Sequence, residues 1–202
     1  MPGSCQVIPI PCQARLRFLT VMSDSVAQTA DNPVLNTERL ELRWLTQDDA
    51  PMMLAVWNDP AFMRYVGDRG VRTVEQAGAA LQAGLLKLYS NYGYGPFRIM
   101  RREDGADLGI CGLFRRDGLD EPDIGFAILP EYCRQGFALE ASVAVLNHAR
   151  DVLKLSSVTA IVSPQNEASI GLLEKLGLRF ERPIRMPEED ADISLYRIDF
   201  PG

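Results

Sequence analysis

Apolar and polar residues alternate in the segment LNTERLELRWLT, which begins at Leu35. Leu40, Leu42 and Trp44 stand at every second position, which is the period of a strand with one buried face. Thr46 is a favourable N-cap for the helix predicted next, and an acidic first turn suits the positive end of that helix. The apolar face of this helix is predicted to contain Met52, Met53, Val56 and Trp57.

A second amphipathic helix is predicted to begin after Thr73. Thr73 and Gln76 have the spacing of a capping box, in which two side chains satisfy backbone N–H groups at the start of a helix. The apolar residues that follow form one stripe at helical spacing: Ala77, Leu81, Leu85 and Leu88. We expect this helix to fray between Tyr89 and Gly95.

The middle of the chain alternates short strands and turns. PFRIMRRED and ADLGICGLFRR flank Asp104-Gly105, a pair that favours the positive φ angles of a tight hairpin turn. PDIGFAILP follows as a further strand. A helix at 137–154, the strand SVTAIVSP and a helix at 166–176 come next, and Gly177 is a typical helix stop.

The last segment, LRFERPIRMPEEDADISLYRIDF, predicts two strands joined by an acidic turn that contains proline. The whole pattern predicts an α+β domain, in which a mixed sheet is flanked by four helices. Residues 1–33 show no such periodicity. They contain three early prolines and lack the long apolar stretch and the small-residue cleavage site of a signal peptide. We therefore expect 1–33 to be a flexible tail, with Met22 a second candidate start, and 34–202 to be the domain.

Composition and charge limit the class of protein. A chain of 202 residues with 47% hydrophobic and 24% charged residues fits one soluble domain. It has 21 Lys and Arg against 27 Asp and Glu, a formal charge of −6. This balance argues against nucleic acid or an anionic membrane as a partner, because both attract clustered positive charge. No window reaches the roughly 18 consecutive apolar residues of a membrane span.

Cysteine and histidine are sparse. The four cysteines form no CxxC pair, which indicates neither a disulfide framework nor a zinc site, and a reducing cytoplasm is the simplest location. Cys111 lies in an apolar strand and is expected in the core. With His148 as the only histidine and no G-x-S-x-G motif, we expect no metal and no serine hydrolase. A structural role is the simpler interpretation of His148.

The strongest functional signal is Ile124 to Ala141, IGFAILPEYCRQGFALEA. A strand runs through Pro130 into a loop that contains Gly136 and then directly into a helix. Backbone N–H groups at a helix N-terminus attract an anion, and a glycine allows close approach. A plain helix start is the alternative interpretation. In the first turn of this helix, the simpler role of Glu140 is a favourable interaction with the helix dipole.

Three segments in order carry a family resemblance: LNTERLELR, GFAILPEYCRQGFALEA and SPQNEASIGLLEKLGL. Together they resemble the GNAT superfamily of N-acyltransferases, over about Leu35 to Phe200, and within it the branch that contains ribosomal-protein N-terminal acetyltransferases. The resemblance implies a mixed, mostly antiparallel sheet of seven strands with four flanking helices. It also implies a splay between strands 4 and 5, and acetyl-CoA as co-substrate.

The resemblance also implies which residues hold the cofactor. The strand 125–129 would pair with the pantetheine arm as an added strand does. The loop 134–138 would place backbone N–H groups on the pyrophosphate, and Arg134 would add positive charge. Asn166 would bind the cofactor arm near the thiol. The implied cofactor residues are Ala127, Ile128, Arg134, Gln135, Gly136, Phe137, Ala138, Asn166 and Ser169.

The implied chemistry is direct attack of an amine on the acetyl thioester. The Ile128 N–H is the expected donor to the thioester carbonyl. Asp123, or less so Glu121 or Asp120, is a candidate base, and the alternative for each is a solvated turn residue. The tyrosine that protonates the thiolate in many relatives is Leu173 here, which leaves Ser169 or an ordered water as alternative acids. Cys133 occupies the first position of the loop motif, where relatives usually have another residue. We expect little effect on cofactor binding, because the rest of the motif binds through main-chain donors.

The sequence does not identify the acceptor, which is a protein N-terminus or a small-molecule amine. Two other hypotheses remain: an acyl-CoA-binding sensor without turnover, and a partner-binding module that binds no cofactor. A homodimer is the commonest assembly for such a chain.

Overall fold

The computed structural model describes residues 6–7, 35–186 and 192–201. Its strands form one sheet in the order β2-β3-β4-β5-β6-β7-β9-β8, and β1 pairs with β6 off this path. The strands are β1 (Gln6–Val7), β2 (Leu35–Asn36), β3 (Leu40–Trp44), β4 (Pro96–Arg101), β5 (Asp107–Phe114), β6 (Asp123–Ile128), β7 (Ser157–Val162), β8 (Arg179–Ile184) and β9 (Ile193–Asp199). The helices are α1 (Ala50–Trp57), α2 (Pro60–Tyr65), α3 (Val74–Ala83), α4 (Leu85–Tyr92), α5 (Phe137–Asp151) and α6 (Glu167–Lys175), with short 3₁₀ turns at Gln47–Asp49 and Pro130–Tyr132.

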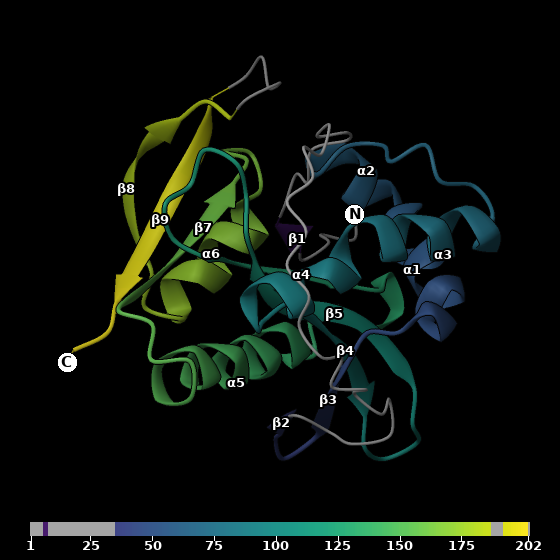
Figure 1. Cartoon of the computed structure of the whole chain (residues 1–202). Coiled ribbons are helices and arrows are strands. Elements are labelled where there is room, and N and C mark those ends of the chain that lie inside the picture. Colours follow the sequence, from purple (N-terminus) through teal and green to yellow (C-terminus); the bar gives the residue numbers. More distant parts are fainter. Residues whose placement is uncertain (1–5, 8–34, 187–191, 202) are drawn as a thin grey trace.

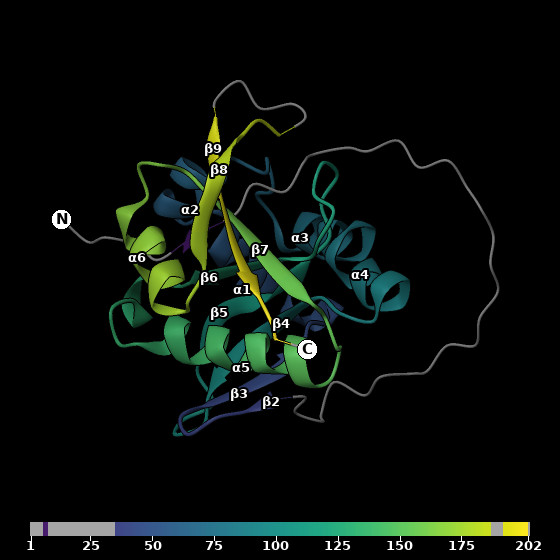
Figure 2. The same cartoon turned by 90° about the vertical axis from the view of Figure 1, so that its left-hand side faces the viewer.

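Helices cover both faces of the sheet (Figures 1 and 2). The long helix α5 packs against β2, β3, β5, β6 and β7, and the Cys111 thiol meets the Ser142 hydroxyl of α5 at 3.5 Å. Helix α1 packs on β5 and on α3, and α3 continues into α4. The core lies between these layers and includes the fully buried Leu40, Leu42, Met53, Ile99, Phe126 and Val145.

The expected fold class is confirmed. Every paired strand runs antiparallel to its neighbour except β6 and β7, which are parallel. The Thr73 capping box forms as predicted. The hairpin turn also forms, with Gly105 at φ +73° between β4 and β5.

The expected counts of seven strands and four helices need correction. The segment LNTERLELRWLT is two strands, because a tight turn at 37–39 folds β2 back on β3, with Leu35 opposite Leu42. Helix α2 is additional: Asp59 caps it by accepting from two backbone N–H groups, and Pro60 occupies its first position. The second predicted helix is split into α3 and α4 at Gly84.

The parallel pair β6 and β7 diverges almost at once. Their register contains one pair, Asp123 opposite Thr159, after which the strands separate. β1 pairs with the separated part of β6, with Gln6 opposite Ala127 and Val7 opposite Phe126. It also contacts β7, α2 and α6, and Figure 1 shows it between the two halves of the sheet. The expected splay between strands 4 and 5 is therefore present between β6 and β7.

No helix among the described residues is long and apolar enough to cross a membrane. The acidic turn expected between the last two strands falls at 187–191, outside the described residues, as does most of the expected tail at 1–33. The rest of the expected C-terminal hairpin is β8 and β9, which pair antiparallel.

Candidate functional site

The separated edge of β6 offers backbone hydrogen-bonding groups. The Leu129 N–H donates to the Leu108 carbonyl at 2.8 Å, so it points toward β5. Because backbone groups of successive residues in a strand point in opposite directions, the Ile128 N–H points away from β5, into the splay. β1 pairs along this same edge. The edge therefore pairs with an extended segment of this chain, and the pairing with a pantetheine arm that the resemblance implies stays a prediction.

The loop after β6 ends in a helix start with no side-chain cap. Arg134 has φ +62° and Gly136 has φ +83°, and Gly136 is the N-cap of α5. A glycine N-cap has no side chain to satisfy the first N–H groups of the helix, so these donors and the positive helix end remain available. A Cβ atom at Gly136 would lie 3.3 Å from the Arg39 guanidinium. Both strain and crowding thus favour glycine at this position.

Arg39 holds this loop against the sheet, a role that the sequence did not indicate. Its side chain donates to a Glu140 oxygen at 2.7 Å and to the Gln135 carbonyl at 3.0 Å. Its guanidinium carbon also lies 4.5 Å from the centre of the Phe137 ring. Burial acts to raise the pKa of Glu140, but hydrogen bonds from Thr37 and Arg39 outweigh it, and the pKa is lowered. Glu140 therefore binds Thr37 and Arg39 in addition to its favourable interaction with the helix dipole.

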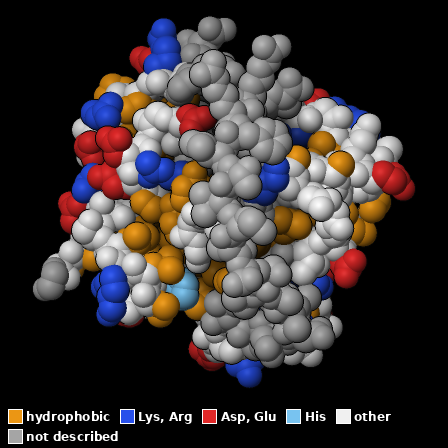
Figure 3. Space-filling model, in the orientation of Figure 1, with side chains coloured by type: hydrophobic (Ala, Val, Ile, Leu, Met, Phe, Trp, Pro, Cys, Tyr) orange, Lys and Arg blue, Asp and Glu red, His pale blue; other side chains and the backbone are white. Residues whose placement is uncertain are grey.

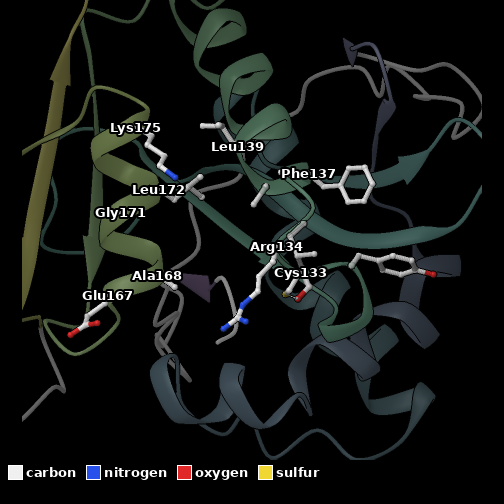
Figure 4. Close-up of a pocket in the computed structure, with 13 residues that line it drawn as sticks. Cys133, Arg134, Phe137, Leu139, Glu167, Ala168, Gly171, Leu172 and Lys175 are labelled. Atoms are coloured by element: carbon white, nitrogen blue, oxygen red, sulfur yellow. Dashed lines mark hydrogen bonds between the residues drawn. The ribbon is translucent and has the colours of Figure 1, made fainter. Parts of the chain in front are cut away.

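A pocket of about 440 Å³ lies between this loop and α6. In Figure 4, Cys133, Arg134 and Phe137 come from the loop and the start of α5, whereas Leu172 and Lys175 come from α6. Of the residues predicted to hold the cofactor, those that line the pocket are Ile128, Arg134, Gly136, Phe137 and Ala138. The volume lies within the usual range for sites of small molecules and cofactors.

Four of the nine predicted cofactor residues do not line the pocket, and Gln135 and Ala127 are two of them. Gln135 is exposed, and its side chain donates to the Glu131 carbonyl at 2.9 Å. Ala127 is buried, and its backbone pairs with β5 and β1. Lys175, which the sequence analysis missed, lines the pocket opposite Arg134. It stands in the last turn of α6, one turn beyond Gly171, so helical spacing from the second motif was the available signal.

Asn166 and Ser169 lie together at the start of α6. Asn166 is the N-cap, and its side-chain oxygen accepts from the Ser169 N–H at 3.2 Å. Both residues are buried and neither lines the pocket. Leu173, one turn further, is fully buried. Asn166 therefore caps the N-terminus of α6.

Asp123 is not a solvated turn residue, which corrects that alternative. It is fully buried at the closed end of the splay, and the Arg116 Nε donates to it at 2.8 Å. Burial raises the pKa of Asp123, and the charge of Arg116 partly offsets this rise. Within the described chain, the second Asp123 oxygen and both terminal nitrogens of Arg116 have no hydrogen-bond partner.

The other candidate bases are less suited. Glu121 is partly exposed and forms an ion pair with Arg197, and Asp120 is exposed. Asp123 stands opposite Phe114 in the β5–β6 register, so the two side chains share a face of the sheet. Cys111, three residues before Phe114, faces α5. Because side chains alternate along a strand, Phe114 and Asp123 face the opposite side, which α1 covers.

Several simpler interpretations hold. Burial raises the pKa of the Cys111 thiol to about 12, as expected of a core residue. His148 packs edge-on against Phe97, and burial lowers its pKa. Trp57 and Tyr89 are buried in the core, whereas Tyr92 is exposed.

Within the described residues, no group of three or more His, Cys, Asp or Glu side chains is placed to hold a metal. On the face shown in Figure 3, described acidic and basic side chains lie interspersed along the rim. That face shows no single basic patch of the kind that binds a phosphate backbone. The cationic side chains that line the pocket are Arg134 and Lys175.

Known proteins are similar to this chain in both sequence and fold. The model of the acetyltransferase (GNAT) domain family matches residues 39–179. A Bacillus subtilis (strain 168) protein, "Uncharacterized N-acetyltransferase YoaA", is 33% identical over 154 residues, which cover 76% of this chain and 86% of that protein.

Two solved structures of acetyltransferases have a fold similar to that of this chain. The acetyltransferase (GNAT family) from Bacillus anthracis is 25% identical with a TM-score of 0.67, over 82% of this chain and 97% of that chain. The RimL ribosomal L7/L12 alpha-N-protein acetyltransferase in complex with coenzyme A has a TM-score of 0.71 at 15% identity, over 83% of this chain and 98% of that chain. At that identity, the second likeness concerns the fold alone.

Proposed function

Since this chain belongs to the GNAT acetyltransferase family, we propose that it transfers an acetyl group from acetyl-CoA to a primary amine. The observation that carries the proposal is one pocket bordered by the end of β6, where it has separated from β7, and by the glycine-capped start of α5. A strand edge suits the amide groups of pantetheine, and a helix start suits a pyrophosphate. The acceptor is a protein N-terminus or a small-molecule amine.

For the cofactor, the loop 134–138 supplies backbone donors and Arg134 supplies charge. Lys175 extends the positive charge along α6 on the other side of the pocket. In an acidic chain, these two cations give an anionic ligand a locally favourable field. Within the family, we propose the ribosomal-protein-acetyltransferase-like branch, on the three motifs quoted above.

For the reaction, the Ile128 N–H is our candidate donor to the thioester carbonyl, because it points away from β5. The amine must lose a proton as it attacks, and Asp123 is our candidate final acceptor for it. Asp123 and Ile128 stand at opposite ends of β6, about 16 Å apart, so the proton would reach Asp123 through water. Burial raises the pKa of Asp123, and its second oxygen has no hydrogen-bond partner among the described residues. Ser169 or a water protonates the departing thiolate. Ser169→Ala is expected to lower kcat more than it weakens acetyl-CoA binding, and equal losses would make Ser169 a binding residue only.

Thermal unfolding with and without acetyl-CoA tests the cofactor. Acetyl-CoA at 100 times its Kd adds about 2.7 kcal/mol of stability, so a clear rise in Tm is expected. An unchanged Tm at millimolar acetyl-CoA contradicts the proposal and favours a module that binds no cofactor.

An acyl-CoA sensor is the second candidate, because Leu173 occupies the position of the usual acid and is buried. Release of free thiol from acetyl-CoA in the presence of an amine panel separates the two. Amine-dependent release supports the enzyme. A raised Tm without any amine-dependent release supports the sensor.

A further inference from the structure

The short strand β1 lies in the splay between β6 and β7. It pairs with β6, and it also contacts β7, α2 and α6. Figure 1 shows it between the two halves of the sheet. In the proposed function, the edge of β6 at 125–129 pairs with the pantetheine arm, and α6 borders the cofactor pocket. A segment of the chain itself therefore occupies the edge that the cofactor needs.

The register of this pairing shows which backbone groups β1 uses. The Ile128 N–H points away from β5 and into the splay, and Phe126, two residues earlier in the strand, has the same orientation. Phe126 stands opposite Val7. In an antiparallel pair, residues opposite each other at such a position exchange both backbone hydrogen bonds. Val7 therefore faces β6 with its N–H and carbonyl, whereas the backbone groups of Gln6 point away from β6.

The inner end of the pocket coincides with the position of β1. Ile128 at the end of β6 lines the pocket, whereas Ala127 does not line it and stands opposite Gln6. A pantetheine arm that starts at the loop 134–138 and follows the edge of β6 meets β1 directly after Ile128. The arm and β1 cannot both pair with Phe126.

The pairing is short, which makes it reversible. If the ladder continued, position 9 would face Ile124, but this position is proline and has no N–H to donate. The segment 1–14 also contains no charged side chain, so its entry into the splay removes no charged side chain from water. A short, uncharged strand of this kind is suited to be displaced by a ligand that binds the same edge.

We propose that β1 is an intramolecular inhibitor, which must leave the splay before acetyl-CoA can bind. This inference rests on the proposed function. A protein that begins at Met22, the second candidate start, lacks β1 and has an open edge. The apparent Kd of the full chain is the intrinsic Kd divided by the fraction of molecules with an open splay. A splay that is closed in about nine of ten molecules thus weakens binding about tenfold.

The test is calorimetric titration of acetyl-CoA into four proteins: the full chain, residues 22–202, Val7→Pro and Gln6→Pro. Val7→Pro removes the N–H that faces Phe126. Gln6→Pro is the matched control, because it makes the same change at a neighbouring position whose N–H points away from β6. We expect a Kd about tenfold lower than that of the full chain for 22–202 and for Val7→Pro, and an unchanged Kd for Gln6→Pro. Should 22–202 not fold, the two point variants still decide.

Hydrogen exchange of the full chain supplies a direct readout of β1. The Val7 amide should be protected in the protein without cofactor, because it is hydrogen-bonded to β6. At saturating acetyl-CoA, this amide should exchange as fast as it does in Val7 of a free peptide of residues 1–12.

Three results overturn the inference: the same Kd for the full chain, 22–202 and Val7→Pro, an equal effect of Gln6→Pro and Val7→Pro, or a Val7 amide that stays protected when acetyl-CoA is bound. In each of these cases acetyl-CoA still binds, and the proposed function stands. Absence of binding to all four folded proteins removes both the inference and the proposed function.

Discussion

Arg39→Ala is the variant that best probes how the sheet organises the anion-binding loop. It removes the ion pair to Glu140, the hydrogen bond to the Gln135 carbonyl and the contact over the Phe137 ring. Arg39 is 45% exposed and Glu140 18% exposed, so solvent weakens the ion pair to about 0.2–1 kcal/mol. The ring contact adds about 0.5–1 kcal/mol. We expect a total loss of about 1–2 kcal/mol.

The assay is urea unfolding, followed by calorimetric titration of acetyl-CoA. The midpoint should fall with no change in slope, since the surface exposed on unfolding stays the same. Acetyl-CoA should bind about three- to tenfold more weakly, because the loop is less well ordered before binding. Arg43→Ala is the control: Arg43 forms an ion pair on the same strand, with Glu41, and does not contact the loop. Lost stability with unchanged affinity would refute the idea that Arg39 organises the loop.

Three further outcomes follow from the described contacts. Removal of residues 1–21 should lower the Kd for acetyl-CoA, because β1 and the pantetheine arm need the same edge of β6; an unchanged Kd in calorimetry would contradict this competition. Folding lowers the pKa of Glu140, so the stability that Glu140 contributes is present above its usual pKa of 4.5 and is lost as the pH falls toward the folded pKa. The urea midpoint of Glu140→Gln should therefore depend less on pH in the acid range than the midpoint of the wild type. An identical pH dependence of the two proteins would argue against the pair of Glu140 and Arg39. In the protein that lacks residues 1–21, a thiol reagent should modify Cys133, and bound acetyl-CoA should protect it. The same reagent should modify Cys111 only when the protein unfolds. Mass spectrometry that finds Cys111 modified first would contradict the burial of Cys111.

Local patterns predicted most elements well. The Thr73 capping box, the Asp104-Gly105 turn and the strand–loop–helix at Gly136 each depend on residues within a few positions of one another, so a single sequence contains the signal. The fold class followed from the order of these elements. The break between α3 and α4 was missed because the apolar stripe continues across Gly84, where only the backbone conformation changes.

Contacts between distant segments could not be predicted in the same way. Arg39 and Glu140 are 101 positions apart, and nothing local to Arg39 indicates its partner. Asp123 follows a turn-rich segment, which favours an exposed carboxylate, but the sheet places it beside Arg116 in the interior. Five of the residues that the resemblance implied for the cofactor line the pocket, as does Lys175, which the resemblance did not indicate.

In the proposed function the loop before α5 holds the acetyl-CoA phosphates, and calorimetric titration of acetyl-CoA into Gly136→Glu is the sharpest test of this binding. The control is Gly105→Glu, which places the same side chain at a similar positive φ of +73° in an open turn. We expect normal affinity for Gly105→Glu and no measurable binding for the folded Gly136→Glu protein, because the new side chain blocks the loop and repels the phosphates. Binding of acetyl-CoA to Gly136→Glu with the affinity of the control would contradict it.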